Sequence, residues 1–297
     1  MKLLRLATIV ALSTTVFAGG STAVFADEVR DVTTEGQVQF RAFDPDEDGD
    51  GEDSEVINPD PDGPDVEINP DIPGTTGPLS IIKVATMNFG TQVISNQDQT
   101  YSMVAEMQQL TGTEGEDNKV PYVSFAQVQD VRGTNAGWDL QVSLSNFTSN
   151  TQNNVLTGAE IEFVGSRIQY EGNNVANAPS AHAAGLTLSP TTGARSVMTA
   201  SRGQGAGSSS VVWGNRAELN TQFEDEEIET VLNNAIQLSI PGSTAKDATT
   251  YTATLSWELT STPDEDGPEE ETPDEDGSEE ETPDEDGPEE ETPEVDA

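Results

Sequence analysis

Two segments with a strict period of two, 137–145 and 250–259, constrain the fold of this chain most. In each segment apolar and polar residues alternate, which is the pattern of a β-strand with one buried and one solvent-facing side. Each segment also contains a Trp-x-Leu tripeptide, Trp138–Leu140 in the first and Trp257–Leu259 in the second. The second segment ends just before Pro263, so the chain between the two must fold back to give the last strand a partner. We therefore expect both segments to belong to one domain.

Short apolar runs separated by Asn, Asp, Gly and Ser fill the chain between residues 78 and 262, which is typical of an all-β protein. Further strands are expected at 79–84, 89–90, 92–94, 101–104, 120–131, 159–164, 186–188, 211–213 and 235–240. Helical periodicity is weak, and only 224–234 is predicted to form either a short helix or a charged loop. We predict an all-β, β-sandwich-like single domain in residues 78–262, flanked by disordered acidic segments.

Acidic residues are concentrated on both sides of this predicted domain. The chain has 12 Lys and Arg residues against 55 Asp and Glu residues, a formal net charge of −43 and 33% hydrophobic residues. Residues 27–77 are rich in Asp, Glu, Pro and Gly and are predicted to be an extended spacer. Residues 263–297 repeat the unit Thr-Pro-Asp-Glu-Asp-Gly-Pro-Glu-Glu-Glu and are predicted to be disordered. With this charge and no basic patch, nucleic acid is excluded as a partner.

Residues 1–26 have the features of an export signal. Lys2 and Arg5 accompany an apolar run, and Ala23 and Ala26 supply the small residues of a cleavage site. The run is shorter than a membrane-spanning helix and is interrupted by Ser, Thr and Gly, so no integral membrane segment is expected after signal cleavage. The chain has no Cys, which excludes a lipid anchor on a Cys side chain. We expect a secreted protein that is held outside the cell by non-covalent contacts.

A match to a calcium-binding loop lies within the spacer. Asp44, Asp46, Asp48 and Glu55 fit positions one, three, five and twelve of an EF-hand loop, and a glycine fits its turn. Against this interpretation, Gly51 replaces the usual apolar residue and neither flank has a helical pattern. The alternative is diffuse cation binding to a solvated acidic run, in which such a match arises by chance. Calcium is the one cofactor considered, and otherwise none is expected.

The order of these features resembles the WxL domain proteins of low-GC Gram-positive bacteria. The resemblance rests on Gly137–Leu140 and Leu255–Leu259, and on Leu79–Ile81 and Asn88–Gly90 after the acidic spacer. It implies an exported protein that is held non-covalently on the cell surface by a domain attached to peptidoglycan, often together with other surface proteins. Family members usually end shortly after the second tripeptide. This chain instead continues into the acidic repeat, which puts unimpeded wall attachment in question.

The candidate ligand-binding residues are those of the two tripeptides, Trp138, Leu140, Trp257 and Leu259. An aromatic ring can stack on the apolar face of a sugar, so the two Trp side chains are suited to glycan contact. Each Trp also shares its strand face with Leu, Val or Tyr, so core packing is the alternative interpretation. Trp213, beside a glycine, is a lesser candidate.

Patterns typical of catalysis are sparse. His182 is the single His of a chain without Cys, so neither a metal cluster nor a Cys/His nucleophile pair is supported. Glu160 and Glu162 lie on the same face of one predicted strand, where adjacent carboxylates are commonly just solvated. The glycines of 203–207 lack the strand-to-helix context of a phosphate site. We therefore predict no metal and no enzymatic activity.

Three hypotheses for the function follow from these observations. The first is a secreted cell-surface protein attached to the cell wall through peptidoglycan binding by a WxL-type domain. The second is a surface-assembly or adhesin subunit that binds other surface proteins or host matrix, with the Trp strands purely structural. The third is a glycan hydrolase that uses Glu160 and Glu162, which has the least support.

Overall fold

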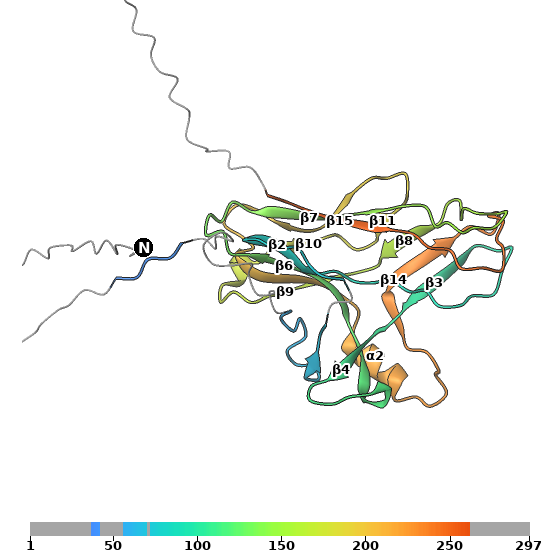
Figure 1. The fold of residues 1–297 in the computed structure, drawn as a ribbon, viewed down its shortest axis with the longest axis horizontal. Coiled ribbons are helices and arrows are strands. Elements are labelled where there is room, and N and C mark those ends of the chain that lie inside the picture. The colour runs from blue at the N-terminus through green and yellow to red at the C-terminus, as the bar shows by residue number, and fades with distance from the viewer. Residues whose placement is uncertain (1–36, 42–55, 70–71, 262–297) are drawn as a thin grey trace, which may run out of the picture. The chain divides into compact units, whose positions relative to one another are not determined.

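The structure is a computed structural model that describes residues 37–41, 56–69 and 72–261 (Figure 1). Residues 37–41 contain no helix or strand, and the side chains of Val38 and Phe40 are exposed. In the described part of the chain, no helix is long and apolar enough to cross a membrane. The calcium-loop candidates Asp44, Asp46, Asp48 and Glu55, the predicted signal and the acidic repeat all lie outside the described residues.

Antiparallel strands make up most of the regular structure. The strands are β1 (Val66–Glu67), β2 (Leu79–Lys83), β3 (Gln99–Val104), β4 (Glu106–Leu110), β5 (Lys119–Tyr122), β6 (Ser124–Asp130), β7 (Trp138–Leu144), β8 (Glu160–Phe163), β9 (Arg167–Tyr170), β10 (Ser180–Ala181), β11 (Leu186–Leu188), β12 (Arg195–Ala200), β13 (Gly207–Trp213), β14 (Leu232–Ile240) and β15 (Leu255–Ser261). The helical elements are η1 (Glu116–Asn118), η2 (Val175–Asn177) and α2 (Arg216–Phe223).

These strands form four small sheets in the described residues. Their strand orders are β1-β4-β5, β2-β6-β13-β9, β11-β8-β14-β3 and β10-β12-β7-β15, and every pairing is antiparallel. The all-β prediction is therefore confirmed. A sandwich of two packed sheets is not confirmed, because the strands are divided among more than two sheets.

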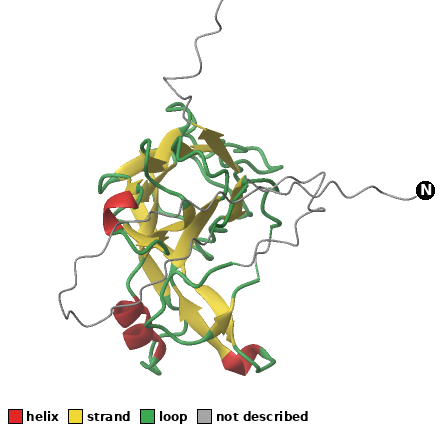
Figure 2. Cartoon of the chain, turned by 90° about the vertical axis from the view of Figure 1, so that its left-hand side faces the viewer, coloured by secondary structure: helices red, strands yellow, loops and turns green. Residues whose placement is uncertain are grey.

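The three four-stranded sheets share one main hydrophobic core. Figure 2 shows strands arranged around a common centre. Val128 of β6, Ile161 of β8 and Val142 of β7 are fully buried in it, one from each sheet. Strand β7 shows how sequence produces this core, because its buried and half-buried residues alternate along its whole length. The period of two in 137–145 therefore predicted both the strand and the face that it buries.

A smaller core lies under the β1-β4-β5 sheet and α2. Tyr122, Phe125, Val212 and Leu219 are buried in it. Helix α2 begins at Asn215, whose side-chain oxygen accepts hydrogen bonds from the backbone N–H groups of the first turn. Leu219 is the one buried residue of α2, and Gln222 also ties the helix to the backbone of Leu232 by two hydrogen bonds of 2.9 Å.

Residues 56–69 pack onto this smaller core, although they belong to the predicted spacer. Val66 of β1 lies opposite Leu110 of β4 and is buried. The side-chain amide of Gln127 donates to the backbone oxygen of Ile57 at 2.8 Å and its oxygen accepts from the Ile57 N–H at 2.9 Å. Asp60 forms ion pairs with Arg216 and Arg167 at 3.5 and 3.8 Å. The ordered part of the chain thus begins before the Pro78 predicted from composition.

Several predicted elements differ from the observed ones. Residues 92–94 and 89–90 are not strands, and Val93 is exposed at the surface. The helix lies at Arg216–Phe223, and residues 224–231 form a charged loop, which was the alternative predicted for 224–234, before β14 begins at Leu232. Strands β4, β9 and β12 were not predicted, since their sequences alternate weakly and their partners are distant in the chain.

Candidate functional site

The two Trp-x-Leu tripeptides lie side by side on neighbouring strands. Strand β7 pairs with β15 in antiparallel register, and Leu140 lies directly opposite Leu259. In the same register Trp138 lies opposite Ser261, and Trp257 lies opposite Val142. The sequence expectation that the last strand folds back is thereby confirmed, and its partner is the other Trp strand itself.

The first tripeptide belongs to the interior of the protein. Strand β7 is flanked by β12 on one side and β15 on the other, and both Trp138 and Leu140 are fully buried. The indole N–H of Trp138 donates to the backbone oxygen of Gly205 at 3.1 Å, which satisfies its one polar group. Trp138 and Leu140 thus have no accessible surface for a ligand. Both side chains therefore pack in the main core.

The glycine loop at 203–207 closes over the Trp138 ring. Gly205 has a φ of +75°, and a Cβ atom placed there would lie 2.6 Å from Trp138 Nε1 and 2.5 Å from the Ala200 Cβ. Only glycine allows this close approach of backbone to ring and the left-handed conformation together. The loop, which the sequence analysis left without a chemical role, is a structural lid on Trp138.

The second tripeptide lies on an edge strand and keeps part of its surface accessible. Strand β15 pairs only with β7 in its sheet, and Leu255, Trp257 and Leu259 are half-buried while Glu258 is exposed. The three apolar side chains pack against the main core with their inner sides. Of the four predicted ligand residues, Trp257 and Leu259 are the two that a ligand could reach.

Trp257 contacts the ring of Trp213, which in turn contacts the rings of Phe163 and His182. The Trp257 and Trp213 rings are tilted, with centroids 6.3 Å apart, and Trp213 stacks on Phe163 at 4.7 Å. His182 stacks on the Trp213 ring at 6.2 Å. The half-exposed Trp257 is therefore the outermost member of an aromatic cluster that extends into the core.

His182 is bound on both of its ring nitrogens. The indole N–H of Trp213 donates to His182 Nε2 at 2.9 Å, and His182 Nδ1 lies 2.7 Å from the backbone oxygen of Ala183. An indole N–H can only donate, so Nε2 is the acceptor and the ring proton of the neutral imidazole is on Nδ1. Burial lowers the pKa of His182 from its usual 6.5, and the Ala183 bond opposes this shift. From the sequence, His182 was considered only as a metal ligand or catalytic residue, and its bond to Trp213 was not predicted.

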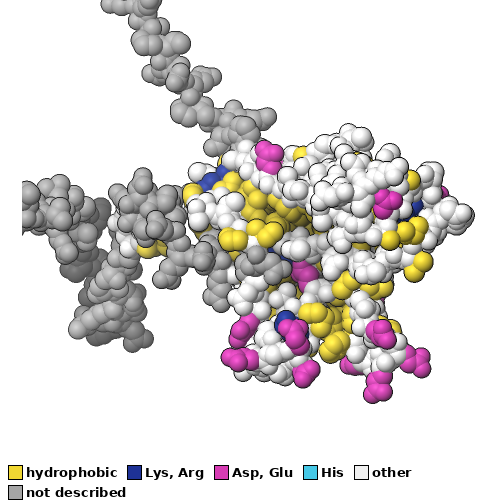
Figure 3. Space-filling model, turned by 45° about the vertical axis from the view of Figure 1, so that its right-hand side comes forward, with side chains coloured by type: hydrophobic (Ala, Val, Ile, Leu, Met, Phe, Trp, Pro, Cys, Tyr) yellow, Lys and Arg dark blue, Asp and Glu magenta, His cyan; other side chains and the backbone are white. Residues whose placement is uncertain are grey.

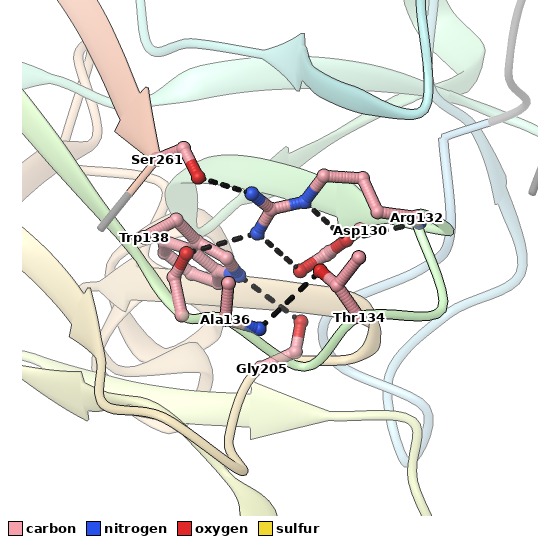
Figure 4. A network of polar contacts seen from close by, with 8 residues as sticks. Asp130, Arg132, Thr134, Ala136, Trp138, Gly205 and Ser261 are labelled. Atoms are coloured by element: carbon pink, nitrogen blue, oxygen red, sulfur yellow. Dashed lines mark hydrogen bonds and ion pairs between the residues drawn. The ribbon is translucent and has the colours of Figure 1, made fainter. Parts of the chain in front are cut away.

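A half-buried arginine ties the ends of the two Trp strands together (Figure 4). Arg132 donates to Asp130 through Nε at 2.9 Å and Nη2 at 2.8 Å, and Nη2 also donates to the Gly137 oxygen at 2.9 Å. Its Nη1 donates to the hydroxyl of Ser261, at the end of β15. Such a bidentate pair fixes orientation as well as charge. The start of β7 and the end of β15 are thereby held by one side chain.

The two glutamates weighed as a catalytic pair lie in another sheet than the tripeptides. Glu160 and Glu162 lie on β8, the first exposed and the second half-buried, opposite Ser239 and Gln237 of β14. Within the described ranges, no group of Asp, Glu and His is arranged to hold a metal ion. The spacing of Asp130 and Arg132 in the sequence is compatible with the ion pair that they form. No sequence pattern predicted that Ser261 lies beside Arg132.

Comparison with known families gives one match. The family model described as "WxL domain surface cell wall-binding" matches residues 27–263. No curated protein and no solved structure matches the chain. The family is one of binding domains at the cell surface, so the protein is placed at the cell wall. The match covers most of the chain and includes both Trp strands, and the chain therefore belongs to the WxL family of cell wall-binding surface proteins.

Proposed function

We propose that the protein is secreted and attaches non-covalently to peptidoglycan through the half-exposed face of β15. The observation that carries this proposal is the contrast between the tripeptides, because Trp257 and Leu259 are accessible while Trp138 and Leu140 are not. A half-exposed indole ring is suited to stacking on the apolar face of a sugar. Its inner neighbour Trp213 is fully buried, so the ring is held in place before a ligand arrives.

The rest of β15 supports a contact of this kind. Leu255 and Leu259 extend the apolar surface on both sides of Trp257, and Glu258 points to the opposite, exposed face. The strand is a rigid element that is paired along its length to the central strand β7, so the three side chains keep a fixed spacing. Secretion would follow from the export signal predicted for residues 1–26.

The test is retention of the purified full-length chain on washed peptidoglycan stripped of teichoic acids. We expect Trp257→Ala to reduce retention and Glu258→Ala to leave it unchanged, because the first alters the apolar face and the second the opposite one. Far-ultraviolet circular dichroism and a urea unfolding curve accompany each variant. A folded Trp257→Ala variant with normal retention would remove Trp257 from the binding surface.

Wild-type protein that is not retained at all would contradict peptidoglycan as the ligand. In that case the second hypothesis, a surface-assembly or adhesin subunit, would take its place. Release of reducing ends from peptidoglycan by the wild type, and not by a Glu160→Gln, Glu162→Gln double variant, would favour the hydrolase. We expect no such release, because the family to which the chain belongs is described as binding the wall.

A further inference from the structure

A cleft separates β4 from the acidic loop that follows α2. The two walls meet where the Ala105 N–H donates to the Val231 oxygen at 2.9 Å, and from there they diverge. The space between them has a volume of about 380 Å³. It is distant in the sequence from both Trp-x-Leu tripeptides, and none of their residues lines it.

The floor of this cleft is apolar and open to solvent. Met107 of β4, Phe223 at the end of α2 and Ile228 of the loop line it, with 40%, 47% and 39% of their surface exposed. Three large apolar side chains from three separate elements thus form one accessible patch. Scattered single apolar residues on a surface are ordinary, but a contiguous patch in a concave site is typical of a binding surface.

One wall of the cleft offers an unpaired strand edge. In the β4–β5 pairing Met107 lies opposite Pro121, which has no N–H, so the backbone polar groups of Met107 face away from β5. On that other side β1 pairs only with Gln109 and Leu110. Among the described residues, no strand therefore covers the edge of β4 at Met107. A second polypeptide can supply both the donor and the acceptor that such an edge requires.

The other wall and rim carry negative charge. Asp225, Glu226 and Glu229 line the cleft, and the loop also contains the exposed Glu224 and Glu227. In the part of the chain that the structure describes, none of these five carboxylates takes part in an ion pair. These carboxylates are close together in the chain, so their negative potentials add. The combined potential favours a cationic ligand and opposes nucleic acid or an anionic lipid surface.

Figure 3 shows this combination of properties on one face of the molecule. At the lower end, where β4 and α2 lie in Figure 1, hydrophobic side chains are exposed between two lobes that carry Asp and Glu side chains. The apolar floor is thus bordered by acidic groups on both sides. A ligand that fits must have apolar side chains in its middle and positive charge beside them.

We propose that this cleft docks an extended segment of a partner protein in which apolar residues alternate with Lys or Arg. The backbone of the segment pairs with the β4 edge at Met107, and its apolar side chains cover Phe223 and Ile228. Its cationic side chains face Asp225, Glu226 and Glu229. This interaction is separate from wall attachment through β15 and gives the protein a second, protein-binding surface.

The test uses the full-length chain and two labelled eight-residue peptides, in 0.15 M NaCl. In the probe peptide Lys and Ile alternate, and in its control every Ile is replaced by Ser, so both peptides carry the same charge. The acidic repeat attracts both peptides equally, and the difference in affinity reports the apolar cleft. We expect fluorescence anisotropy to show at least tenfold tighter binding of the Lys/Ile peptide.

Two pairs of variants locate the binding. Met107→Ser with Ile228→Ser should abolish the preference for the Lys/Ile peptide, and Glu226→Gln with Glu229→Gln should weaken its binding severalfold. The matched controls are Val93→Ser, an exposed apolar residue of another loop, and the distant pair Glu160→Gln with Glu171→Gln. Both controls should bind like the wild type. If circular dichroism shows that Met107→Ser disturbs the fold, the single variant Ile228→Ser tests the apolar contact instead.

Three outcomes would overturn the proposal. The first is equal affinity of the wild type for the two peptides, and the second is a preference that survives the cleft variants. Binding to phosphatidylglycerol vesicles that competes with the Lys/Ile peptide would also overturn it, because the surface would then be a membrane contact. Failure of peptidoglycan retention would leave this result unaffected, since the two surfaces are tested separately.

Discussion

Leu140 and Leu259, the last residues of the two Trp-x-Leu tripeptides, lie directly opposite each other in the β7–β15 pair. The two residues hold the same position in the tripeptide but differ in burial. Leu140 lies on a strand with neighbours on both sides and is fully buried, whereas Leu259 lies on an edge strand and is half-buried. The same three-letter pattern therefore serves the core in one strand and forms an accessible surface in the other.

This difference in burial predicts that truncation to alanine destabilises the protein more at Leu140 than at Leu259. Leu140→Ala removes a fully buried side chain and leaves a cavity, so we expect a loss of about 2–5 kcal/mol in the free energy of unfolding. Leu259→Ala removes a side chain that solvent already reaches, and we expect about 1 kcal/mol. Urea unfolding curves measure both values. Equal losses would mean that β15 is packed as tightly as β7 in solution.

Gly205 and Gly203 provide a second matched pair. Both have positive φ, +75° and +85°, so alanine is strained at either position. A Cβ at Gly205 would also overlap the Trp138 ring, whereas a Cβ at Gly203 meets no atom within 4 Å. We expect Gly205→Ala to destabilise the fold by about 1–3 kcal/mol more than Gly203→Ala. Thermal unfolding and Trp fluorescence measure this difference, and similar values for the two would contradict the close packing of this loop on Trp138.

The arginine network predicts a strong, non-additive effect. Asp130 is almost completely buried, so Arg132→Met leaves its carboxylate without a charged partner, at a cost of about 3 kcal/mol. Adding Asp130→Asn removes the unpaired charge, and the double variant should be more stable than the sum of the single losses predicts. The exposed Arg195→Met is the control, with an expected change within about 0.5 kcal/mol. Additive losses in urea unfolding would show that the pair is not coupled.

His182 makes the stability of the aromatic cluster depend on pH. Burial holds the pKa of His182 below its usual 6.5, so the unfolded chain takes up this proton at a higher pH than the folded chain. The contribution of the neutral ring is therefore complete above about pH 6.5 and is lost as the pH falls through the lowered pKa. Protonation also places an N–H on Nε2 against the donor of Trp213, which cannot accept it.

The variant His182→Gln tests this dependence. The Gln side chain offers an oxygen to the Trp213 N–H but does not titrate. We expect the free energy of unfolding to fall more for the wild type than for the variant when the pH changes from 7.5 to 5.5. Other titrating groups are common to both proteins and cancel in the comparison. Parallel pH profiles would show that folding does not lower the pKa of His182.

Local patterns predicted the strands, and distant pairings decided their exposure. The period of two identified β7 and β15 and assigned both Trp residues to inner faces. The two strands differ because β12 pairs with β7 on its other side, which makes β7 a central strand and leaves β15 at the edge of the sheet. The sequence of β12 alternates weakly, so this pairing was not predicted. Burial of Trp138 and exposure of Trp257 could thus not be separated from the sequence alone.

The contacts between distant side chains were also beyond sequence reasoning. His182 and Trp213 are separated by 31 residues, and the first follows β10 while the second ends β13, so no local spacing marks their hydrogen bond. The acidic run 224–229 indicated a helix or a loop, and the outcome depends on Asn215, which starts the helix earlier. The alternation of Val66 and Ile68 was present within the spacer, but the surrounding acidic and Pro residues obscured it.

The net charge of the chain predicts how salt affects its retention on cell walls. The chain carries a formal net charge of −43, and a wall with anionic polymers is also negative, so long-range repulsion opposes docking at low ionic strength. At 0.1 M salt the Debye length is about 10 Å, so the repulsion between chain and wall is largely screened. An apolar contact at Trp257 does not depend on this screening. Retention on intact walls should therefore rise with moderate NaCl, the reverse of a basic wall binder.

Calcium at millimolar concentration should raise retention further, because divalent cations can bridge carboxylates of the chain to wall phosphates. Deleting residues 264–297 removes much of the acidic charge and should flatten both dependences, while retention on stripped peptidoglycan stays the same. Sedimentation of walls with bound protein at increasing NaCl, with and without calcium, measures these effects. Steady loss of the full-length protein between low and moderate NaCl would mean that attachment is mainly ionic, and the apolar face of β15 would not be the anchor.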